Sequence, residues 1–170
     1  MAEKAKVSEK ENPMRAIKIE KLVINIGMGG PGERLEQAKI ILERLAEKKP
    51  VYRKTSKRST FNVAKGRNIG VIATLRDDAA ENMLKRLILA KEGKLAKKSF
   101  SGRTFSFGIP EYLDIPGIEY DPKIGILGMD ICVTLKRPGI KKGLKIGKNH
   151  QITSDEARKF ISKTFEVGLI

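Results

Sequence analysis

The sequence predicts an α+β domain in which an antiparallel or mixed sheet carries helices on one face and leaves the other face open. The 170 residues, 40% of them hydrophobic, are enough for one domain with a core of its own. Apolar and polar residues alternate along several short runs, as they do in strands that are buried on one side only. In other segments apolar residues recur at helical spacing and form a single stripe.

The chain begins with a segment rich in Lys and Glu, residues 1–13, that ends at Pro13. We expect a flexible leader here and a single domain over residues 14–170. No run approaches the roughly 18 continuous apolar residues of a membrane span, and the first residues lack the apolar core of a secretion signal. The sequence therefore predicts a cytoplasmic protein without a membrane partner.

The first strand is predicted over residues 17–26, where β-branched residues are frequent. Its alternation changes phase near Lys21, so we expect an irregular start. With that phase, Asn25 points to the face opposite Ile24 and Ile26.

Three amphipathic helices are predicted from the apolar spacing. The first spans residues 33–48 and ends before Pro50. Asp77 is the expected N-cap of the second helix, and Thr153 with Glu156 offers a capping box that opens the third. The expected buried stripes are Leu35, Ala38, Ile41, Leu42 and Leu45 in the first helix, Ala80, Met83, Leu84, Leu87 and Ile88 in the second, and Ala157, Phe160 and Ile161 in the third.

The remaining strands lie between these helices. Residues 51–76 predict two strands joined by a long basic connection, with turn chemistry at Gly66 and Asn68. Residues 104–109 predict another strand, and residues 125–136 alternate cleanly enough to predict the last. The last run is expected to place Leu127, Met129, Ile131, Val133 and Leu135 on the buried face of the sheet and Asp130, Thr134 and Lys136 on the polar face.

A glycine motif separates the first strand from the first helix, because Gly27, Gly29 and Gly32 spell G-x-G-x-x-G. A dinucleotide site also needs an acidic residue about 20 positions further on, and residues 48–76 contain no Asp or Glu. An arginine replaces the acid in NADP enzymes, and Arg53 is available, but the alternating strands do not resemble a parallel sheet buried on both faces. We interpret the glycines as permitting a tight turn and a close backbone approach, either to RNA phosphate or to the chain itself. No cofactor is predicted.

Catalytic and metal chemistry finds little support in the sequence. Cys132 is the only cysteine and His150 the only histidine, so one chain cannot build a disulfide or a Cys/His zinc site. Cys132 is expected to be a structural thiol. Because no acid/base pair or metal cluster has a convincing spacing, we do not expect an enzyme or a metal site.

Charge indicates the class of partner. Lys and Arg number 35 against 20 Asp and Glu, which leaves a net charge of +15 and a pI of about 10.0. A folded domain with this excess usually binds a polyanion, most often nucleic acid, although a solvated, highly charged surface is the alternative. The charge is segregated: residues 48–76 carry nine basic residues and no acid, residues 136–148 form a second acid-free basic cluster, and acids gather in residues 111–121.

The basic run "RKTSKRSTFN" mixes cations with hydroxyls and an amide, the combination that contacts phosphates, sugars and 2′-hydroxyls. Aromatic residues are only 5% of the chain, so few platforms for stacked bases are available. We therefore expect the open face of the sheet to bind folded RNA through its backbone and shape.

Five stretches, taken together and in this order, resemble one family. They are "VINIGMGGPGE", "KPVYRKTSKRSTFNVAKGRNIGVIATLR", "FSFGIPE", "IPGIEYDP" and "GMDICVTL". The sequence is similar to large-subunit ribosomal protein family five in the universal nomenclature, the family that binds 5S rRNA. The resemblance covers roughly residues 14–137. The tail from about residue 139 departs from the bacterial pattern and suggests the archaeal type.

The resemblance implies a structural constituent of the large ribosomal subunit, placed in the central protuberance and in contact with 5S rRNA and 23S-type rRNA. It also implies contacts with a second 5S rRNA-binding ribosomal protein, with a small-subunit protein at an intersubunit bridge, and with P-site tRNA. By motif position, the implied rRNA-binding residues are Asn25, Arg53, Lys54, Thr55, Thr74 and Arg76. The implied tRNA-facing loop comprises Lys57, Arg58, Ser59, Thr60, Phe61 and Asn62.

Two alternatives stay open at this point. A free RNA-binding translational regulator or RNA chaperone would share every charge feature of a ribosomal protein. Several of the implied contacts, Thr74 above all, are also compatible with ordinary strand residues.

Overall fold

The computed structural model describes residues 12–58, 63–122, 124–140 and 146–170. Most of the predicted leader, residues 1–11, lies outside these ranges, and Pro13 begins a short 3-10 helix, η1 (Pro13–Arg15). The α-helices and strands that follow are β1 (Lys18–Gly27), α1 (Glu33–Ala46), β2 (Val51–Lys54), β3 (Asn68–Leu75), α2 (Asp77–Ala90), β4 (Lys94–Leu95), β5 (Phe100–Ser101), β6 (Thr104–Ile109), β7 (Met129–Lys136), α3 (Ser154–Phe165) and β8 (Gly168–Leu169). Three further 3-10 turns are η2 (Lys97–Ser99), η3 (Tyr112–Asp114) and η4 (Lys148–His150).

Six strands form one sheet in the order β2-β3-β1-β7-β6-β5, and every neighbouring pair is antiparallel. A separate parallel pair, β4 with β8, holds the end of the chain beside the segment that follows α2. The predicted α+β class with an antiparallel sheet is therefore confirmed.

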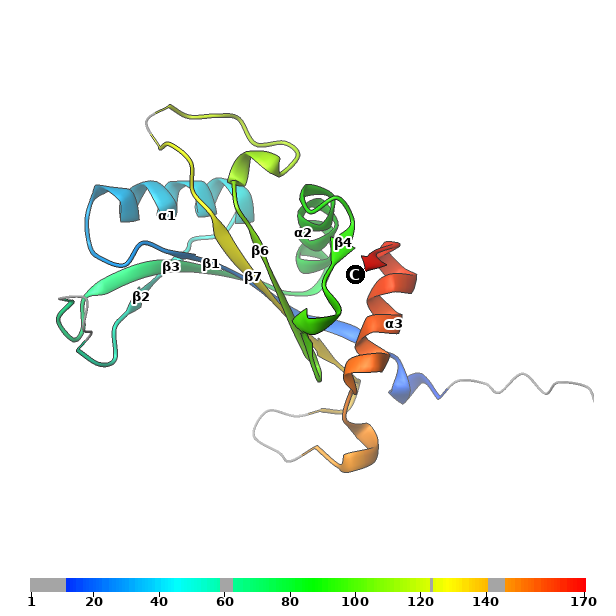
Figure 1. Cartoon of the computed structure of the whole chain (residues 1–170). Coiled ribbons are helices and arrows are strands. Elements are labelled where there is room, and N and C mark those ends of the chain that lie inside the picture. Colours follow the sequence, from blue (N-terminus) through cyan, green and yellow to red (C-terminus); the bar gives the residue numbers. More distant parts are fainter. Residues whose placement is uncertain (1–11, 59–62, 123, 141–145) are drawn as a thin grey trace, which may run out of the picture.

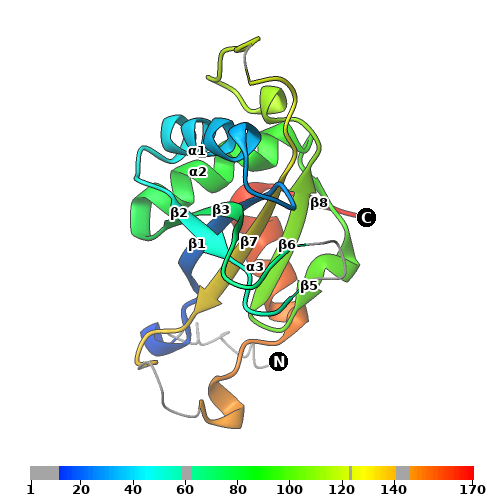
Figure 2. The same ribbon diagram turned by 90° about the vertical axis from the view of Figure 1, so that its left-hand side faces the viewer.

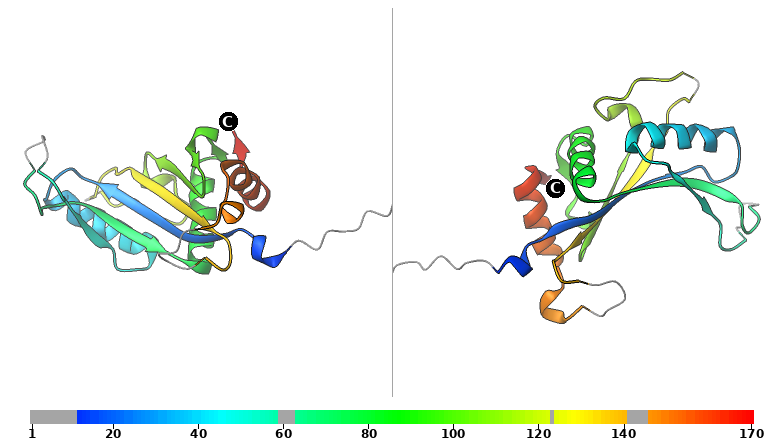
Figure 3. Two further views of the ribbon diagram at one scale, coloured as in Figure 1. Left: turned by 90° about the horizontal axis from the view of Figure 1, so that it is seen from below. Right: turned by 180° about the vertical axis from the view of Figure 1, so that it is seen from behind.

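Helices α1 and α2 lie on the same side of the sheet (Figures 1 and 2). Seen from below, the strands lie in front of α1 and α2, so the opposite face of the central strands carries neither helix (Figure 3, left). The core fills the space between the two layers, and Leu22, Ile24 and Ile26 of β1 are fully buried in it. The prediction of helices on one face and an open second face is confirmed.

Strand β1 occupies the middle of the sheet, and its start is irregular as predicted. The register with β7 shifts between Ile19 and Lys21, which lets Ile19 and Leu22 both face the core although they are three residues apart. An extra residue in one strand of an antiparallel pair has this effect on the alternation. Beyond the shift, Asn25 points away from the core.

The glycine loop between β1 and α1 folds back on the chain. The backbone N–H groups of Met28 and Gly29 both donate to the carbonyl of Ile69, at 2.9 and 3.1 Å. Gly29 has φ of +75°, a conformation that favours glycine. The structure supports the tight turn, but a Cβ at Gly27, Gly29 or Gly32 would meet nothing within 4 Å, so a close approach of the protein's own chain does not account for these glycines.

The predicted stripes of α1 and α2 are confirmed, because all five predicted core positions of α1 and all five of α2 are buried. In α3, by contrast, Ala157 and Ile161 are buried but Phe160 is only half-buried.

Not every predicted cap agrees with the structure. The prediction that Asp77 is the N-cap of α2 is wrong: Arg76 holds the cap position without a side-chain hydrogen bond, and Asp77 is the first helical residue, with φ of +56°. The α3 capping box is confirmed, because Thr153 accepts from the Glu156 amide and Glu156 accepts from the Thr153 amide.

The tail after β7 is fastened to the domain by a buried cation. Arg137 has a side chain that is 7% exposed, and it donates to Glu156 at 2.8 Å and to the carbonyl of Gln151 at 3.2 Å. Arg158 of α3 donates to the carbonyl of Lys97, which ties α3 to η2. Helix α3 thus packs beside the β5 edge of the sheet.

Candidate nucleic-acid interface

The open face is built by the residues that alternate with the buried ones. The strand register aligns them in a row across five strands, from Val51 through Ile72, Asn25 and Asp130 to Gly108. A neighbouring row runs through Thr74, Val23, Cys132 and Ser106. Because side chains in a row lie on the same side of adjacent strands, they form a continuous surface.

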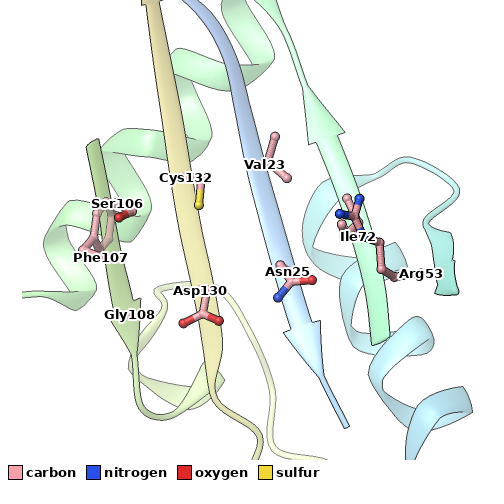
Figure 4. Close-up of a pocket in the computed structure, with 9 residues that line it drawn as sticks. All are labelled: Val23, Asn25, Arg53, Ile72, Ser106, Phe107, Gly108, Asp130 and Cys132. Atoms are coloured by element: carbon pink, nitrogen blue, oxygen red, sulfur yellow. The ribbon is translucent and has the colours of Figure 1, made fainter. Parts of the chain in front are cut away.

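The centre of this surface is a hollow of about 780 Å³, which we call the open-face hollow. Its lining residues are Val23, Asn25, Arg53, Ile72, Ser106, Phe107, Gly108, Asp130 and Cys132. Figure 4 shows Asn25 on β1 next to Asp130 on β7, with Val23 and Cys132 one step further along the same two strands. The hollow therefore combines an apolar floor with an amide, a carboxylate and a guanidinium.

Cys132 corrects one expectation. The sequence predicts a structural thiol, but Cys132 is exposed on the open face. The reason is its position in β7, where Ile131 and Val133 are both fully buried and the residue between them must point to the opposite face.

A second, adjoining hollow lies at the base of the basic connection between β2 and β3. It is lined by Arg53, Lys54, Thr55, Ser56, Lys57, Arg58 and Ile69. Arg53 lines both hollows, so the open face and the basic connection form one continuous surface. Of the predicted loop, Lys57 and Arg58 are exposed, whereas Ser59, Thr60, Phe61 and Asn62 lie outside the described residues.

Thr55 stabilises the base of the connection between β2 and β3 through three hydrogen bonds. Its hydroxyl donates to the carbonyl of Ala64 at 3.0 Å, and its backbone N–H donates to the carbonyl of Arg67 at 2.9 Å. The backbone N–H of Gly66, which has φ of +83°, donates to the Thr55 carbonyl. These bonds close the base of the connection and confirm the predicted turn near Gly66.

The other predicted rRNA-binding residues are spread along β3. Thr74 lies on the open face opposite Val23 and is half-buried. Arg76 is exposed directly after β3. It lies six positions beyond Gly70, the partner of Arg53, which corresponds to roughly 20 Å along a strand. The structure thus brings Asn25 and Arg53 to one hollow and leaves Arg76 at the far end of the sheet.

The second basic cluster predicted in residues 136–148 is only partly a surface of free charge. Arg137 is buried and paired with Glu156, so it does not face outward. The Thr153 amide and, after it, the Arg137 guanidinium hold the pKa of Glu156 below its usual range. Lys141, Lys142 and Lys145 lie outside the described ranges.

The acidic residues of segment 111–121 lie in the connection between β6 and β7. Asp121 pairs with Arg44 of α1 at 3.4 Å, and Arg86 of α2 donates to the carbonyl of Pro116 at 2.7 and 3.2 Å. These contacts hold the segment against the helical layer rather than the open face. Tyr120 and Ile126, which are 57% and 61% exposed, project from the same connection.

Sequence reasoning missed several residues of the open-face hollow. The alternation of polar and apolar residues places Asp130 on the polar face of its strand, but it does not predict that Asp130 lines a binding site. Ile72 and Cys132 were missed because an apolar residue or a thiol on an open face has no signature of its own. Only the register, which sets Asn25 beside both Ile72 and Asp130, shows that these residues share a site.

The described ranges contain neither a metal cluster nor a membrane-spanning helix. No group of three or more His, Cys, Asp or Glu residues in them is arranged to hold a metal ion. None of the helices described there is long and apolar enough to cross a membrane.

Comparison with known proteins identifies the family. Residues 12–61 match the family model described as ribosomal protein L5, and residues 68–164 match the model that describes the C-terminus of the same ribosomal family. The large ribosomal subunit protein uL5 of Archaeoglobus fulgidus is 41% identical over 94% of this chain and 93% of its own. The uL5 protein of Cenarchaeum symbiosum is 42% identical over 92% of this chain and 98% of its own. The uL5 protein of Sulfolobus acidocaldarius is also 42% identical, over 96% of each chain. With both halves matched and relatives aligned over almost its whole length, this chain belongs to the uL5 family of large ribosomal subunit proteins.

Proposed function

We propose that the protein is a structural constituent of the large ribosomal subunit that binds 5S rRNA in the central protuberance with its open sheet face. The observation that carries the proposal is the continuity of the open-face hollow with the basic connection through Arg53. A face that carries polar groups at its centre and cations at one end suits RNA, whose backbone contacts position the protein and whose base and sugar contacts give selectivity.

We assign the proposed 5S rRNA contacts to the open face and the proposed tRNA contacts to the basic connection. Asn25, Arg53 and Thr74 would meet 5S rRNA on the open face, together with Lys54, Thr55 and Arg76 at its margins. Lys57 and Arg58 stand at the start of the connection, which would continue through Ser59, Thr60, Phe61 and Asn62 to the P-site tRNA. The Thr55 hydroxyl already donates to the Ala64 carbonyl, so in this contact it would accept a hydrogen bond from the RNA.

Further ribosomal partners need other surfaces. Segment 111–121 is acidic in a chain of net charge +15 and lies on the helical layer, so it is the surface best suited to a basic small-subunit protein at an intersubunit bridge. Additional contacts with 23S-type rRNA and with a second 5S rRNA-binding protein are part of the same proposal. As a uL5 family member the protein is cytoplasmic and ribosomal, and we propose no catalytic activity for it.

A free translational regulator or RNA chaperone remains the alternative, and a competition experiment separates the two. Labelled 5S rRNA is bound to the purified protein and challenged with bulk tRNA and with a scrambled RNA of equal length across a salt series. A preference for 5S rRNA that survives near-physiological salt supports the ribosomal proposal. If all three RNAs compete equally and salt abolishes their binding together, the protein is a nonspecific polyanion binder and the proposal fails.

A further inference from the structure

Asp130 is an exposed carboxylate in the middle of the face that we propose for RNA. In the register it lies between Asn25 on β1 and Gly108 on β6. It has no hydrogen bond or ion pair with any other described residue. Arg53, the cation of the same hollow, is three strands away, roughly 14 Å at the usual spacing of strands, and so is too distant to neutralise it.

A carboxylate at this position opposes the rest of the protein's charge. It repels phosphate, so it would weaken a contact that only follows the RNA backbone. It strengthens binding only if the RNA presents hydrogen-bond donors to it, because an ionised carboxylate is an acceptor with two oxygens. In RNA these donors are base N–H groups and 2′-hydroxyls.

The residues around Asp130 indicate which hydrogen-bond donors of the RNA can fit next to its carboxylate. Asn25 stands directly opposite in the register, and the Cβ atoms of such cross-strand pairs lie about 4.5 to 5.5 Å apart. Its amide supplies donor hydrogens next to the two carboxylate oxygens. Gly108, on the other side, has no side chain, and a Cβ there would lie 3.7 Å from Asp130 Oδ1. The carboxylate is therefore open to solvent on that side, with apolar Val23 and Cys132 beside it.

This pattern matches one base edge. The Watson–Crick edge of guanine offers two adjacent donors, N1–H and the N2 amino group, followed by the O6 acceptor. Two carboxylate oxygens accept the donors, and the Asn25 amide donates to O6. Adenine and cytosine each direct a ring-nitrogen acceptor at the carboxylate, and uracil has a single donor between two carbonyls, so none of them fits as well.

We propose that Asp130, together with Asn25, reads the Watson–Crick edge of an unpaired guanine in the bound RNA. The guanine must be unpaired because a base pair would occupy that edge. The inference rests on the proposed function, since it assumes that the open face binds RNA. It adds a specificity-determining residue and the class of nucleotide that this residue selects.

The substitution Asp130→Asn tests the proposal by the sign of its effect. It removes one negative charge and replaces an acceptor oxygen by a donor amide. If Asp130 reads guanine, the affinity for 5S rRNA falls roughly 5- to 150-fold, the range for one good bidentate base contact, while the salt dependence of binding stays the same. If Asp130 is a bystander, the affinity stays the same or rises because a repulsive charge has been removed, and the proposal is overturned.

Asp114→Asn is the matched control. Asp114 is exposed in η3, in the acidic segment next to the helical layer, so the same change of charge there should not lower the affinity for 5S rRNA. Thermal unfolding of both variants checks that the fold is intact.

An inosine-substituted RNA supplies the second readout, because inosine lacks only the N2 amino group of guanine. Inosine replaces one unpaired guanine of 5S rRNA at a time, which leaves the base pairs of the RNA unchanged. At the contacted position, wild-type protein should bind the inosine RNA more weakly than normal 5S rRNA, and Asp130→Asn should lose most of that difference. An equal inosine penalty in both proteins would show that Asp130 does not contact the guanine edge.

The proposed function and this inference fail in different ways. If wild-type protein has no preference for 5S rRNA over scrambled RNA, the proposed function fails. The binding of wild type and of Asp130→Asn is then compared on short single-stranded RNAs that contain either guanine or inosine. A preference of wild type for guanine that Asp130→Asn lacks still supports the inference. Equal binding of both strands by both proteins overturns it.

Discussion

Asn25 lies on the open face because Ile24 and Ile26, its neighbours in β1, are both fully buried. Strand alternation predicts this orientation from the sequence, because the side-chain period of a strand is two residues. The same reasoning explains why Cys132 is exposed between Ile131 and Val133. Where a strand is short or flanked by loops, as at Arg53 and Lys54, the register rather than the alternation decides what lies together.

Asn25→Ala removes a polar contact without removing a charge. We expect 5S rRNA to bind about 2- to 10-fold more weakly, the effect of one net hydrogen bond, with an unchanged slope of affinity against salt. Filter binding at several salt concentrations measures both quantities. A variant that melts well below wild type would instead identify Asn25 as a structural residue of β1.

Lys57→Ala and Arg58→Ala remove exposed cations at the start of the basic connection. Log affinity falls as log salt rises, and each lost phosphate contact should make the slope of this fall shallower by about 0.7 to 0.9. The same titrations with Lys159→Ala, an exposed cation of α3 beside the opposite edge of the sheet, supply the control. A slope that does not change in either loop variant would remove these two residues from the interface.

At the scale of elements, the stripes of the helices could be predicted but their caps only in part. Apolar spacing is read from one segment, and all ten predicted core positions of α1 and α2 are buried. The Asp77 cap failed because the turn from β3 into α2 places Arg76 at the N-cap, a geometry that the sequence does not encode locally. The α3 cap succeeded because a capping box is a local motif.

The pairing of β1 with β3 depends on one glycine. A Cβ at Gly70 would lie 2.8 Å from the carbonyl oxygen of Ile26, closer than ordinary packing allows. Gly70→Ala should therefore destabilise the protein by about 1 to 3 kcal/mol, as overpacking usually does. Chemical denaturation measures the change in the free energy of unfolding.

Gly27→Ala is the matched control, because Gly27 pairs with Gly70 in the register and has open space where a Cβ would be. We expect it to change the free energy of unfolding by less than about 0.5 kcal/mol. Equal destabilisation by the two substitutions would contradict the close contact at Gly70.

The link between Arg137 and Glu156 makes the stability of the tail depend on pH. The Thr153 amide and the Arg137 guanidinium lower the pKa of Glu156 in the folded protein, so the stabilisation is present above the unfolded pKa and is lost as the pH falls through the folded pKa. Glu156→Gln should destabilise the protein at neutral pH by about 1 kcal/mol, since the carboxylate is 43% exposed and solvent screens the pair.

Melting temperatures of wild type and Glu156→Gln should therefore converge as the pH falls below the usual range of a glutamate pKa. Asp155→Asn is the control substitution. The side chain of Asp155 pairs with Arg158 but is 79% exposed, so its substitution should change the melting temperature less. A constant difference between wild type and Glu156→Gln from neutral to acidic pH would show that the charge of Glu156 contributes nothing.

At the scale of the whole molecule, the sequence predicts the segregation of charge but not its arrangement in space. The basic connection after β2 joins the open face through Arg53, whereas segment 111–121 is held on the helical layer by Arg44 and Arg86. Arg137 belongs to a basic run in the sequence, yet it is buried against Glu156, 19 residues further on. Such long-range pairings depend on tertiary structure, which a reading of local patterns cannot supply.

If 5S rRNA covers the open face of the sheet, as we propose, it must shield Cys132, and this side chain is therefore a direct probe of the interface. Cys132 is the only cysteine of the chain and it is exposed in the open-face hollow. The rate of its alkylation by iodoacetamide is measured in the free protein, with saturating 5S rRNA and with the same concentration of scrambled RNA. We expect 5S rRNA to slow the reaction at least about 10-fold and scrambled RNA to slow it much less. An alkylation rate that does not change when 5S rRNA is fully bound would contradict this proposal, because the RNA would then lie on another surface.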